Sequence, residues 1–436
     1  MKSKKKHNTK QHNTKTHTKK KHIYNSNNLH KQYNSISLIS HLHKPLYEKN
    51  YAILPKLKGG KFIDKGGYGC VVTPALPCTI NDTSLNLDKY VSKIVKDPEN
   101  DDITSEIKIS NILKKIDPLQ KYFITFENKC YINNIPIDRK DLVSVKYTDN
   151  DLTEYHTIGN SKDKDKEFCD IDISLKPINL IMKHGGISLS SIMKTDRKGN
   201  EKLALMHNMF LDNLKDYFKH LIIGLIKMHE NKIVNRDIKQ KNILLNLTNN
   251  KDNNNKQIIE IKYIDFGLSD FITSDMYKDT SYIHLKGTYF YVAPELFISS
   301  VIKKYNNRSK DYQIKKIMHD INENVKKALT KINEKDMLTN LEKIIETKYD
   351  KIKYLFDNDK LMEAYFSSSK RKFNGYTQKA DVYALGLTIF ETLYHYSKIN
   401  VRQNVKLYNL LINMINLDSD KRYNAVQCLA HPYFKK

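Results

Sequence analysis

Short apolar runs bounded by glycine and polar residues fill the chain from about residue 51 to residue 131. FIDKGG and GCVVTPAL predict the two strands of a β-hairpin, and KYVSKIVKD predicts a third strand. In ITSEIKISNILKKI, residues 103–116, apolar side chains recur three and four positions apart, as on one face of a helix. The stretch 131–176 is polar and irregular, so we interpret it as an insertion.

Beyond about residue 186 the apolar positions predict helices. In FLDNLKDYFKHLIIGLIKMHE they fall on one helical face, whereas ADVYALGLTIFETLYHY is apolar on nearly all sides, as in a helix at the centre of a lobe. The first face consists of Leu211, Leu214, Phe218, Leu221 and Leu225. The Asn-rich stretch 246–255 predicts the tip of a surface hairpin, and the charged, amphipathic stretch 301–374 predicts a helical insertion.

These patterns predict an α+β protein with two lobes. Residues 51–183 would form a small, antiparallel, β-rich lobe with one helix, and residues 184–436 would form a larger helical lobe. Residues 1–50 precede both lobes as a basic tail of low complexity. A cleft between two such lobes is a common place for a small-ligand site.

Charge is concentrated at the start of the chain. The net charge is +25 over 436 residues, and residues 1–47 carry eleven lysines and no acidic residue. This tail cannot bury enough apolar surface to offset its ordering entropy, so we expect it to be disordered. It is either a plain solvated tail, an electrostatic arm for nucleic acid or an acidic partner, or a targeting signal.

The rest of the composition bounds the setting of the protein. The sequence contains no run of 18 apolar residues, so we expect no membrane span. Its lysine-rich start is not typical of a secretory signal. The five cysteines are scattered, odd in number and without metal-ligand spacing, as expected of reduced thiols. They are Cys70, Cys78, Cys130, Cys169 and Cys428. We therefore expect an intracellular protein.

Five motifs in the larger lobe carry a family resemblance. In chain order they are VNRDIKQKNILL at 234–245, YIDFGLS at 263–269, GTYFYVAPE at 287–295, DVYALG at 381–386 and DKRYNAVQCLAHPYF at 420–434. Together they resemble the catalytic loop, the D-F-G and A-P-E motifs, the central helix and the closing segment of eukaryotic-type serine/threonine protein kinases. The resemblance covers roughly residues 60–434, apart from the insertions, and implies the bilobal protein kinase fold.

The resemblance implies a chemical role for each motif residue. Asp237 would accept or orient the proton of the substrate hydroxyl, and Lys239 would stabilise charge on the transferred group. Asn242 and Asp265 would hold magnesium ions that bridge the phosphates of ATP, with manganese as a possible substitute, because oxygen ligands suit such hard cations.

The third predicted strand offers two lysines that could reach the phosphates. Lys93 and Lys96 are an odd number of residues apart, so they lie on opposite faces of a strand. Lys93 shares its face with Val91 and Val95, which we interpret as the inward face; Lys96 would then be solvated. The resemblance gives Lys93 an ion-pair partner, Glu106, which otherwise would be an exposed helix residue.

KFIDKGGYGCVV resembles the glycine-rich loop that covers ATP in protein kinases, but Asp64 replaces its first glycine. Aspartate tolerates turns, so we expect the loop to cover ATP with weakened affinity because of charge repulsion. The resemblance places the adenine ring between Val71 and Leu244. The loop residues that it places at the nucleotide are Ile63, Lys65, Gly66, Gly67, Tyr68, Gly69 and Val71.

Other residues of the motifs bear on substrate and regulation. Lys239 and Thr288 are typical of kinases that act on serine and threonine, and Lys241 favours acidic or neutral acceptor sites. Arg236 predicts that a phosphate on the segment 268–286 would pair with it. Asn235 replaces the histidine usual in the family, and we expect this to loosen the active arrangement.

The sequence therefore predicts an active kinase that phosphorylates proteins on serine and threonine with ATP and magnesium. The alternative is a pseudokinase, a scaffolding module that binds nucleotide and partners without efficient phosphoryl transfer. A nucleic-acid or acidic-partner contact through residues 1–47 would be accessory. The abundance of Asn, Lys, Ile and Tyr is similar to that of kinases of giant DNA viruses, which implies host cytoplasm or virion as the location.

Overall fold

The structure of the chain is a computed structural model. The residues that it describes are 61–65, 69–78, 86–95, 101–131, 177–194, 200–251, 257–272, 288–294, 296, 308–335, 370–397 and 399–435. All of them belong to the compact unit Lys58–Lys436, which is distinct from a first unit, Met1–Leu57. The predicted tail, residues 1–50, and almost all of the predicted polar insertion therefore lie outside the described residues.

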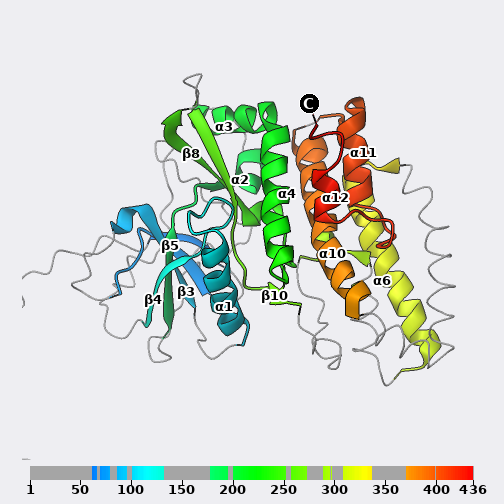
Figure 1. Cartoon of the computed structure of the whole chain (residues 1–436), viewed down its shortest axis with the longest axis horizontal. Coiled ribbons are helices and arrows are strands. Elements are labelled where there is room, and N and C mark those ends of the chain that lie inside the picture. The colour runs from blue at the N-terminus through cyan, green and yellow to red at the C-terminus, as the bar shows by residue number, and fades with distance from the viewer. Residues whose placement is uncertain are drawn as a thin grey trace, which may run out of the picture. The chain divides into compact units, whose positions relative to one another are not determined.

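A five-stranded antiparallel sheet forms the small lobe, in the order β1-β2-β3-β5-β4 (Figure 1). The strands are β1 (Lys61–Lys65), β2 (Gly69–Thr73), β3 (Tyr90–Val95), β4 (Phe126–Tyr131) and β5 (Ile178–Lys183). Helix α1 (Asp101–Ile116) buries Ile103 against Val95, Ile178 and Leu180 of this sheet. The predicted hairpin, third strand and helix are confirmed.

Gly69 begins β2 at the point where this strand lies closest to β3. A Cβ atom on Gly69 would lie 1.9 Å from the carbonyl oxygen of Ile94. No side chain can be accommodated at that distance from backbone, so the sheet requires glycine here. The turn residues just before it, Gly66, Gly67 and Tyr68, lie outside the described residues.

A disulfide joins Cys78, which follows β2, to Cys130 in β4. Our interpretation of the cysteines as reduced thiols is wrong for this pair and for Cys70, which is also disulfide-bonded. Cys78 and Cys130 are 52 positions apart in sequence, and their Cα atoms lie 5.5 Å apart. β2 and β4 are not neighbours in the sheet, so it is the segment after β2 that brings Cys78 to β4. Cys428 is a buried free thiol in the larger lobe, where burial raises its pKa.

Helices dominate the second lobe. They include α2 (Leu189–Lys194), α3 (Glu201–Asp212), α4 (Leu214–Glu230), α10 (Lys370–Glu391), α11 (Val405–Met414) and α12 (Ala425–Leu429), with a π-helical turn, Thr392–Tyr396, after α10. From Ala380 to Leu393 the side chains of this central helix are buried on every side, and α11 and α12 contact it. The prediction of a central helix is confirmed. None of the helices in the described part is long and apolar enough to span a membrane.

The predicted single helical face across residues 211–225 is wrong at its start. Asn213 interrupts it: its backbone N–H closes the end of α3, and its side-chain Nδ2 donates to the carbonyl of Met209 at 2.9 Å. Asparagine competes with regular helical hydrogen bonding in this way. Leu211 therefore belongs to α3, and α4 begins at Leu214.

Two small sheets flank the loops that carry the kinase-like motifs. One contains β6 (Ile187–Ser188), β8 (Ile243–Lys251) and β9 (Gln257–Tyr263), and the other pairs β7 (Ile233–Val234) with β10 (Asp270–Phe271). β8 and β9 form the predicted hairpin, but residues 246–251 of the predicted tip belong to strand β8; residues 252–256 lie outside the described residues. The loops after β7 and after β9 carry the residues of the site.

Helix α6 (Lys310–Lys331) lies in the stretch 301–374, where the sequence predicts a helical insertion (Figure 1, yellow). Ser309 caps its start, since Oγ accepts the N–H of Tyr312 at 3.3 Å. One face of α6 is buried through Ile314, Ile317, Ile321 and Val325. Residues 336–369 of the stretch lie outside the described residues.

Candidate active site

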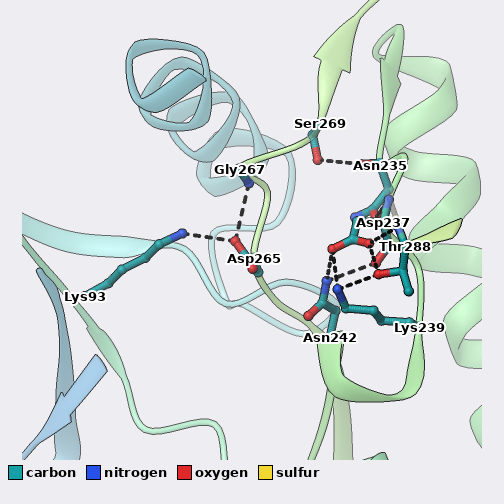
Figure 2. A network of polar contacts seen from close by, with 9 residues as sticks. All are labelled: Lys93, Asn235, Asp237, Lys239, Asn242, Asp265, Gly267, Ser269 and Thr288. Carbon is teal, nitrogen blue, oxygen red and sulfur yellow. Dashed lines mark hydrogen bonds and ion pairs between the residues drawn. The ribbon is translucent and has the colours of Figure 1, made fainter. Parts of the chain in front are cut away.

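Asp237 lies in the loop between β7 and the short 3₁₀ helix Gln240–Asn242, with only 6% of its side chain exposed. Its Oδ2 accepts hydrogen bonds from Asn242 Nδ2 at 2.9 Å and from Lys239 Nζ at 2.8 Å (Figure 2). These two bonds come from residues two and five positions later in the same loop. The sequence motif therefore forms one contiguous polar cluster around the carboxylate.

Thr288 holds the other oxygen of this carboxylate. Its backbone N–H and its hydroxyl donate to Asp237 Oδ1 at 3.1 and 2.9 Å. Lys239 Nζ lies 2.8 Å from Thr288 Oγ1, so the three side chains form a closed triangle (Figure 2). From the sequence we expected Thr288 only to indicate the acceptor class, and we did not predict its contact with Asp237. The position of Thr288 in the GTYFYVAPE motif could have indicated that contact.

A buried carboxylate in the central helix fixes the start of the loop. Asp381 accepts the backbone N–H of Asn235 at 2.8 Å and that of Arg236 at 2.9 Å. These bonds support Arg236 in a left-handed conformation, with φ +68, which is unfavourable for a non-glycine residue. The sequence analysis did not assign this function to Asp381.

Asn235 compensates for the missing histidine by hydrogen bonding. Its Oδ1 accepts the N–H of Asp237 at 3.0 Å, and its carbonyl accepts the hydroxyl of Ser269 at 3.1 Å. Asn235 is buried, and Phe266 of the D-F-G motif packs edge-on against Phe123 at 6.0 Å. Asn235 itself is thus held by hydrogen bonds, and the loosening of the active arrangement stays a prediction.

Lys93 of β3 connects the small lobe to the D-F-G segment. Its Nζ lies 2.6 Å from Glu106 Oε1 and 3.0 Å from Asp265 Oδ1. Asp265 is itself left-handed, with φ +59, and its Oδ1 also accepts the N–H of Gly267 at 3.4 Å. The structure thus brings together Lys93, Glu106 and Asp265, as the sequence predicts.

Burial and charge act in opposite directions on these three groups. Burial raises the pKa of Glu106 above its ordinary value, although Lys93 opposes this. Burial acts in the same direction on Asp265, but the Lys93 ammonium lowers the pKa of that carboxyl below its ordinary value. For Lys93, burial favours the neutral form, yet the two carboxylates raise its pKa, so it stays protonated.

The reason for preferring Lys93 over Lys96 holds only in part. Ser92 and Ile94, on the opposite face of β3, are as fully buried as Val95. Both faces of β3 are therefore inward, and the apolar pattern alone does not distinguish them. The ion pairs of Lys93 identify it, while Lys96 lies outside the described residues.

The predicted nucleotide residues that the structure describes lie in two sheets, and Val71 is next to Lys93. Val71 pairs with Lys93 in β3 and with Asp64 in β1, where the ladder has an irregularity, and Lys65 pairs with Cys70. Ile63, Val71 and Leu244 are half-buried. Gly185 follows β5, and a Cβ atom there would lie 2.6 Å from Leu244 Cδ1, so the chain after β5 passes directly over Leu244.

Asn242 and Asp265 have the chemistry of magnesium ligands. The N–H of Ile264, the residue before Asp265, donates to the carbonyl of Asn242 at 3.1 Å, so the two segments are adjacent. Asn242 gives its Nδ2 to Asp237, which leaves its Oδ1 as an acceptor, and 46% of the Asp265 side chain is exposed. Magnesium uses one or two protein oxygens together with substrate phosphates, so these residues fit it. Within the described residues, no cluster of three or more His, Cys, Asp or Glu side chains forms a separate metal site.

Arg236 has a carboxylate partner close by. Its Nη1 donates to Asp270 Oδ2 at 3.1 Å, and Asp270 pairs with Val234 in the β7–β10 ladder. Residues 273–286 of the segment predicted to carry a phosphate lie outside the described residues. Phosphate pairing with Arg236 stays a prediction.

Comparisons with known proteins agree with this geometry. The family model described as protein kinase domain matches residues 187–434. The DNA damage response protein kinase DUN1 of Saccharomyces cerevisiae is 39% identical over 94 residues, which are 20% of this chain and 18% of that protein. The probable serine/threonine-protein kinase fhkB of Dictyostelium discoideum is 30% identical over 159 residues, 36% of this chain and 12% of that protein. Mitogen-activated protein kinase kinase 7 of Arabidopsis thaliana is 38% identical over 87 residues, 20% and 24% of the two chains. This chain thus covers less than a quarter of the length of each relative.

Proposed function

This chain belongs to the protein kinase domain family, and from that premise we propose that it transfers the γ-phosphoryl group of ATP to serine and threonine hydroxyls of proteins. One observation carries the proposal. Asp237 is held at both carboxylate oxygens by Asn242, Lys239 and Thr288, and the segment of Asp265, which pairs with Lys93, lies next to this cluster (Figure 2). Such fixed charges are what phosphoryl transfer requires, because the protein contributes positioning and electrostatics rather than covalent chemistry.

In the proposed reaction the acceptor oxygen forms a bond to the γ-phosphorus as the bond from that phosphorus to ADP breaks. Asp237 orients the acceptor hydroxyl and takes its proton, and Lys239 neutralises negative charge that develops on the transferred group. Lys93 would hold the phosphates on the side of the small lobe. Magnesium, bound by Asn242 and Asp265, would supply charge neutralisation between the phosphates, and manganese is the alternative ion.

The acceptor class is part of the proposal. Relatives named as serine/threonine kinases support serine and threonine acceptors. Lys241 is exposed in the 3₁₀ helix that follows Lys239, four residues from Asp237. An exposed cation at that place favours acceptor segments that are acidic or neutral.

The competing hypothesis is a pseudokinase, which would bind nucleotide and partners without efficient transfer. It rests on two departures from the family pattern, Asp64 and Asn235. The complete set of Lys93, Asp237, Asn242 and Asp265, together with the hydrogen bonds of Asn235, supports the enzyme. Accessory contacts of residues 1–47 with nucleic acid, a viral origin and an intracellular location remain predictions.

The test is transfer of labelled phosphate from ATP to the full chain itself and to serine, threonine and tyrosine peptides, with magnesium or manganese. We expect label on serine and threonine peptides and none without a divalent ion. Nucleotide binding without any transfer under all these conditions would establish the pseudokinase instead.

A further inference from the structure

Glu391 is a buried carboxylate at the end of the central helix α10, with 1% of its side chain exposed. Its Oε2 accepts the hydroxyl of Tyr291 at 2.6 Å. The same oxygen lies 3.4 Å from Gln240 Nε2, which donates to Thr392 Oγ1 at 3.0 Å. One carboxylate therefore contacts both segments that contribute to the Asp237 cluster.

Gln240 and Tyr291 are each connected to a residue that bonds to Asp237. Gln240 directly follows Lys239, which bonds to Asp237. The backbone N–H of Tyr291 donates to the carbonyl of Thr288 at 2.9 Å, and Thr288 bonds to the other oxygen of Asp237. A displacement of Gln240 or Tyr291 is thus transmitted directly to Lys239 or Thr288.

Lys331, the last residue of α6, forms an ion pair with Oε1 of Glu391. Its Nζ also lies 4.6 Å from the centre of the Phe290 ring, within the range of a cation–π contact. A carboxylate as buried as Glu391 is costly without a cation, and losing one partner of a buried pair leaves an uncompensated charge. Lys331 supplies that cation from α6, which lies outside the five kinase-like motifs.

Helix α6 is fastened on both sides of Lys331. Before it, Asn324 Nδ2 donates to the carbonyl of Val292 at 3.3 Å, next to the segment of Tyr291. After it, the buried carboxylate of Glu334 accepts from Arg402 Nη2 at 2.7 Å and from Tyr408 Oη at 3.1 Å. Hydrogen bonds therefore hold the chain on both sides of Lys331 and position its side chain at Glu391.

We propose that Lys331 is a positioning residue of the phosphoryl-transfer site, acting through Glu391 on Gln240 and Tyr291. The proposal rests on the proposed function for its catalytic consequence. It assigns the helical insertion a role inside the enzyme: α6 orders the catalytic loop and the Thr288 segment around Asp237.

The test compares Lys331→Met and Lys331→Arg with a matched control, Lys315→Met, in the full chain. Lys315 is on the same helix and pairs with Asp311 four residues away on an exposed surface, so its loss leaves the cluster intact. We expect Lys331→Met to lower kcat on the order of 10- to 100-fold with little change in KM for ATP, because small misplacements of reacting groups have effects of this size. Lys331→Arg should restore most of kcat, and Lys315→Met should match the parent chain.

Hydrogen–deuterium exchange of peptides covering 235–242 and 288–292 gives a readout that does not require activity. Lys331→Met should speed exchange in both peptides at temperatures well below its unfolding midpoint, and Lys331→Arg should not. Unchanged exchange and unchanged kcat in Lys331→Met overturn the inference, as does equal loss in the methionine and arginine variants. If the parent chain transfers no phosphate, the proposed function fails, and exchange alone still decides whether Lys331 orders these segments.

Discussion

The Nζ atom of Lys93 lies 2.6 Å from Oε1 of Glu106, so an ion pair joins strand β3 to helix α1 inside the small lobe. The exposed fractions of the two side chains are 14% and 2%. The same ammonium reaches Asp265 in the other lobe. One side chain thus links the sheet, the helix and the D-F-G segment, and its removal must affect all three.

Replacement of this lysine should abolish most of the activity. In Lys93→Met, Glu106 stays buried without its cation, so we expect a loss of about 3 kcal/mol in the free energy of unfolding. Turnover should fall on the order of 100-fold or more, because a fixed charge aimed at the phosphates is lost. Peptide phosphorylation and chemical unfolding measure the two effects. Lys96→Met and Lys129→Met, of which Lys129 is exposed, are controls that should keep activity. Loss of activity in Lys96→Met but not in Lys93→Met would show that Lys96 is the phosphate-binding lysine.

Replacement of the candidate base should separate chemistry from binding. Asp237→Asn keeps the size of the side chain but removes the proton acceptor, so turnover should fall on the order of 100- to 10,000-fold. ATP binding should be nearly unchanged, since Lys93 and Asp265 remain. Single-turnover assays and ATP titration test this, with the exposed Asp216→Asn of α4 as the control. Normal turnover in Asp237→Asn would remove Asp237 from the mechanism.

Gly69 should not tolerate even alanine. The added Cβ would lie 1.9 Å from the Ile94 carbonyl oxygen, so β2 and β3 must separate. We expect a destabilisation of about 1–3 kcal/mol, as for other overpacked sites, seen as a lower melting temperature. Gly224→Ala is the comparison, because its Cβ would meet a ring carbon of Tyr263 at 3.1 Å and helix propensity favours alanine there. Equal melting temperatures for Gly69→Ala and the parent would contradict the sheet geometry.

The disulfide should make the small lobe sensitive to reductant. Cys78 and Cys130 close a loop with a sequence separation of 52, for which the chain-entropy model gives a stabilisation of about 4 kcal/mol. Chemical unfolding of Cys78→Ser and of the parent without reductant measures it, and the variant should unfold earlier. Dithiothreitol should lower the stability of both, because Cys70 is also disulfide-bonded. Cys428→Ser should keep the full response to reductant, because Cys428 is a free thiol.

Acid should destabilise the protein in part through His220. This ring stacks on Tyr122 at 4.4 Å, and its Nε2 lies 3.0 Å from the carbonyl of Lys121. Burial lowers the pKa of His220 below its ordinary value, although the carbonyl opposes this. The unfolded chain therefore binds a proton at this histidine more tightly than the folded chain does. The contribution of His220 to the free energy of unfolding is fully present above about pH 6.5 and is lost as the pH falls through the lowered pKa.

Unfolding midpoints of His220→Gln and the parent between pH 7.5 and pH 5 measure this contribution. The variant should show a flatter loss of stability over that range, whereas the exposed His319→Gln should follow the parent. Parallel curves for His220→Gln and the parent would exclude His220 as a source of the acid sensitivity.

Local sequence patterns were enough to predict the parts of the site that lie close together in the chain. Asp237, Lys239 and Asn242 occupy one loop, so their spacing alone brings their side chains together. The strand pattern predicted β1, β2 and β3, and the helix pattern predicted α1. These features depend on contacts among near neighbours or on motifs whose spacing reflects a fixed local geometry.

Long-range contacts could not be predicted in the same way. Lys331 and Glu391 lie on different helices, and no local pattern distinguishes Lys331 from the other lysines of α6. Cys78 and Cys130 meet because the segment after β2 reaches β4, a strand that is not its neighbour in the sheet. The break at Asn213 was missed because the apolar period continues through it while the hydrogen bonds do not.

The two backbone bonds that Asp381 accepts from Asn235 and Arg236 have a consequence for how this protein can be controlled. They join the start of the Asp237 loop to the buried central helix, so a change at Asp237 is expected to begin at other contacts of the site. Those contacts are the Lys93–Glu106 pair, the Thr288 segment and the Glu391 carboxylate. An inhibitor that depends on a conformational change should accordingly be directed at these three parts of the site.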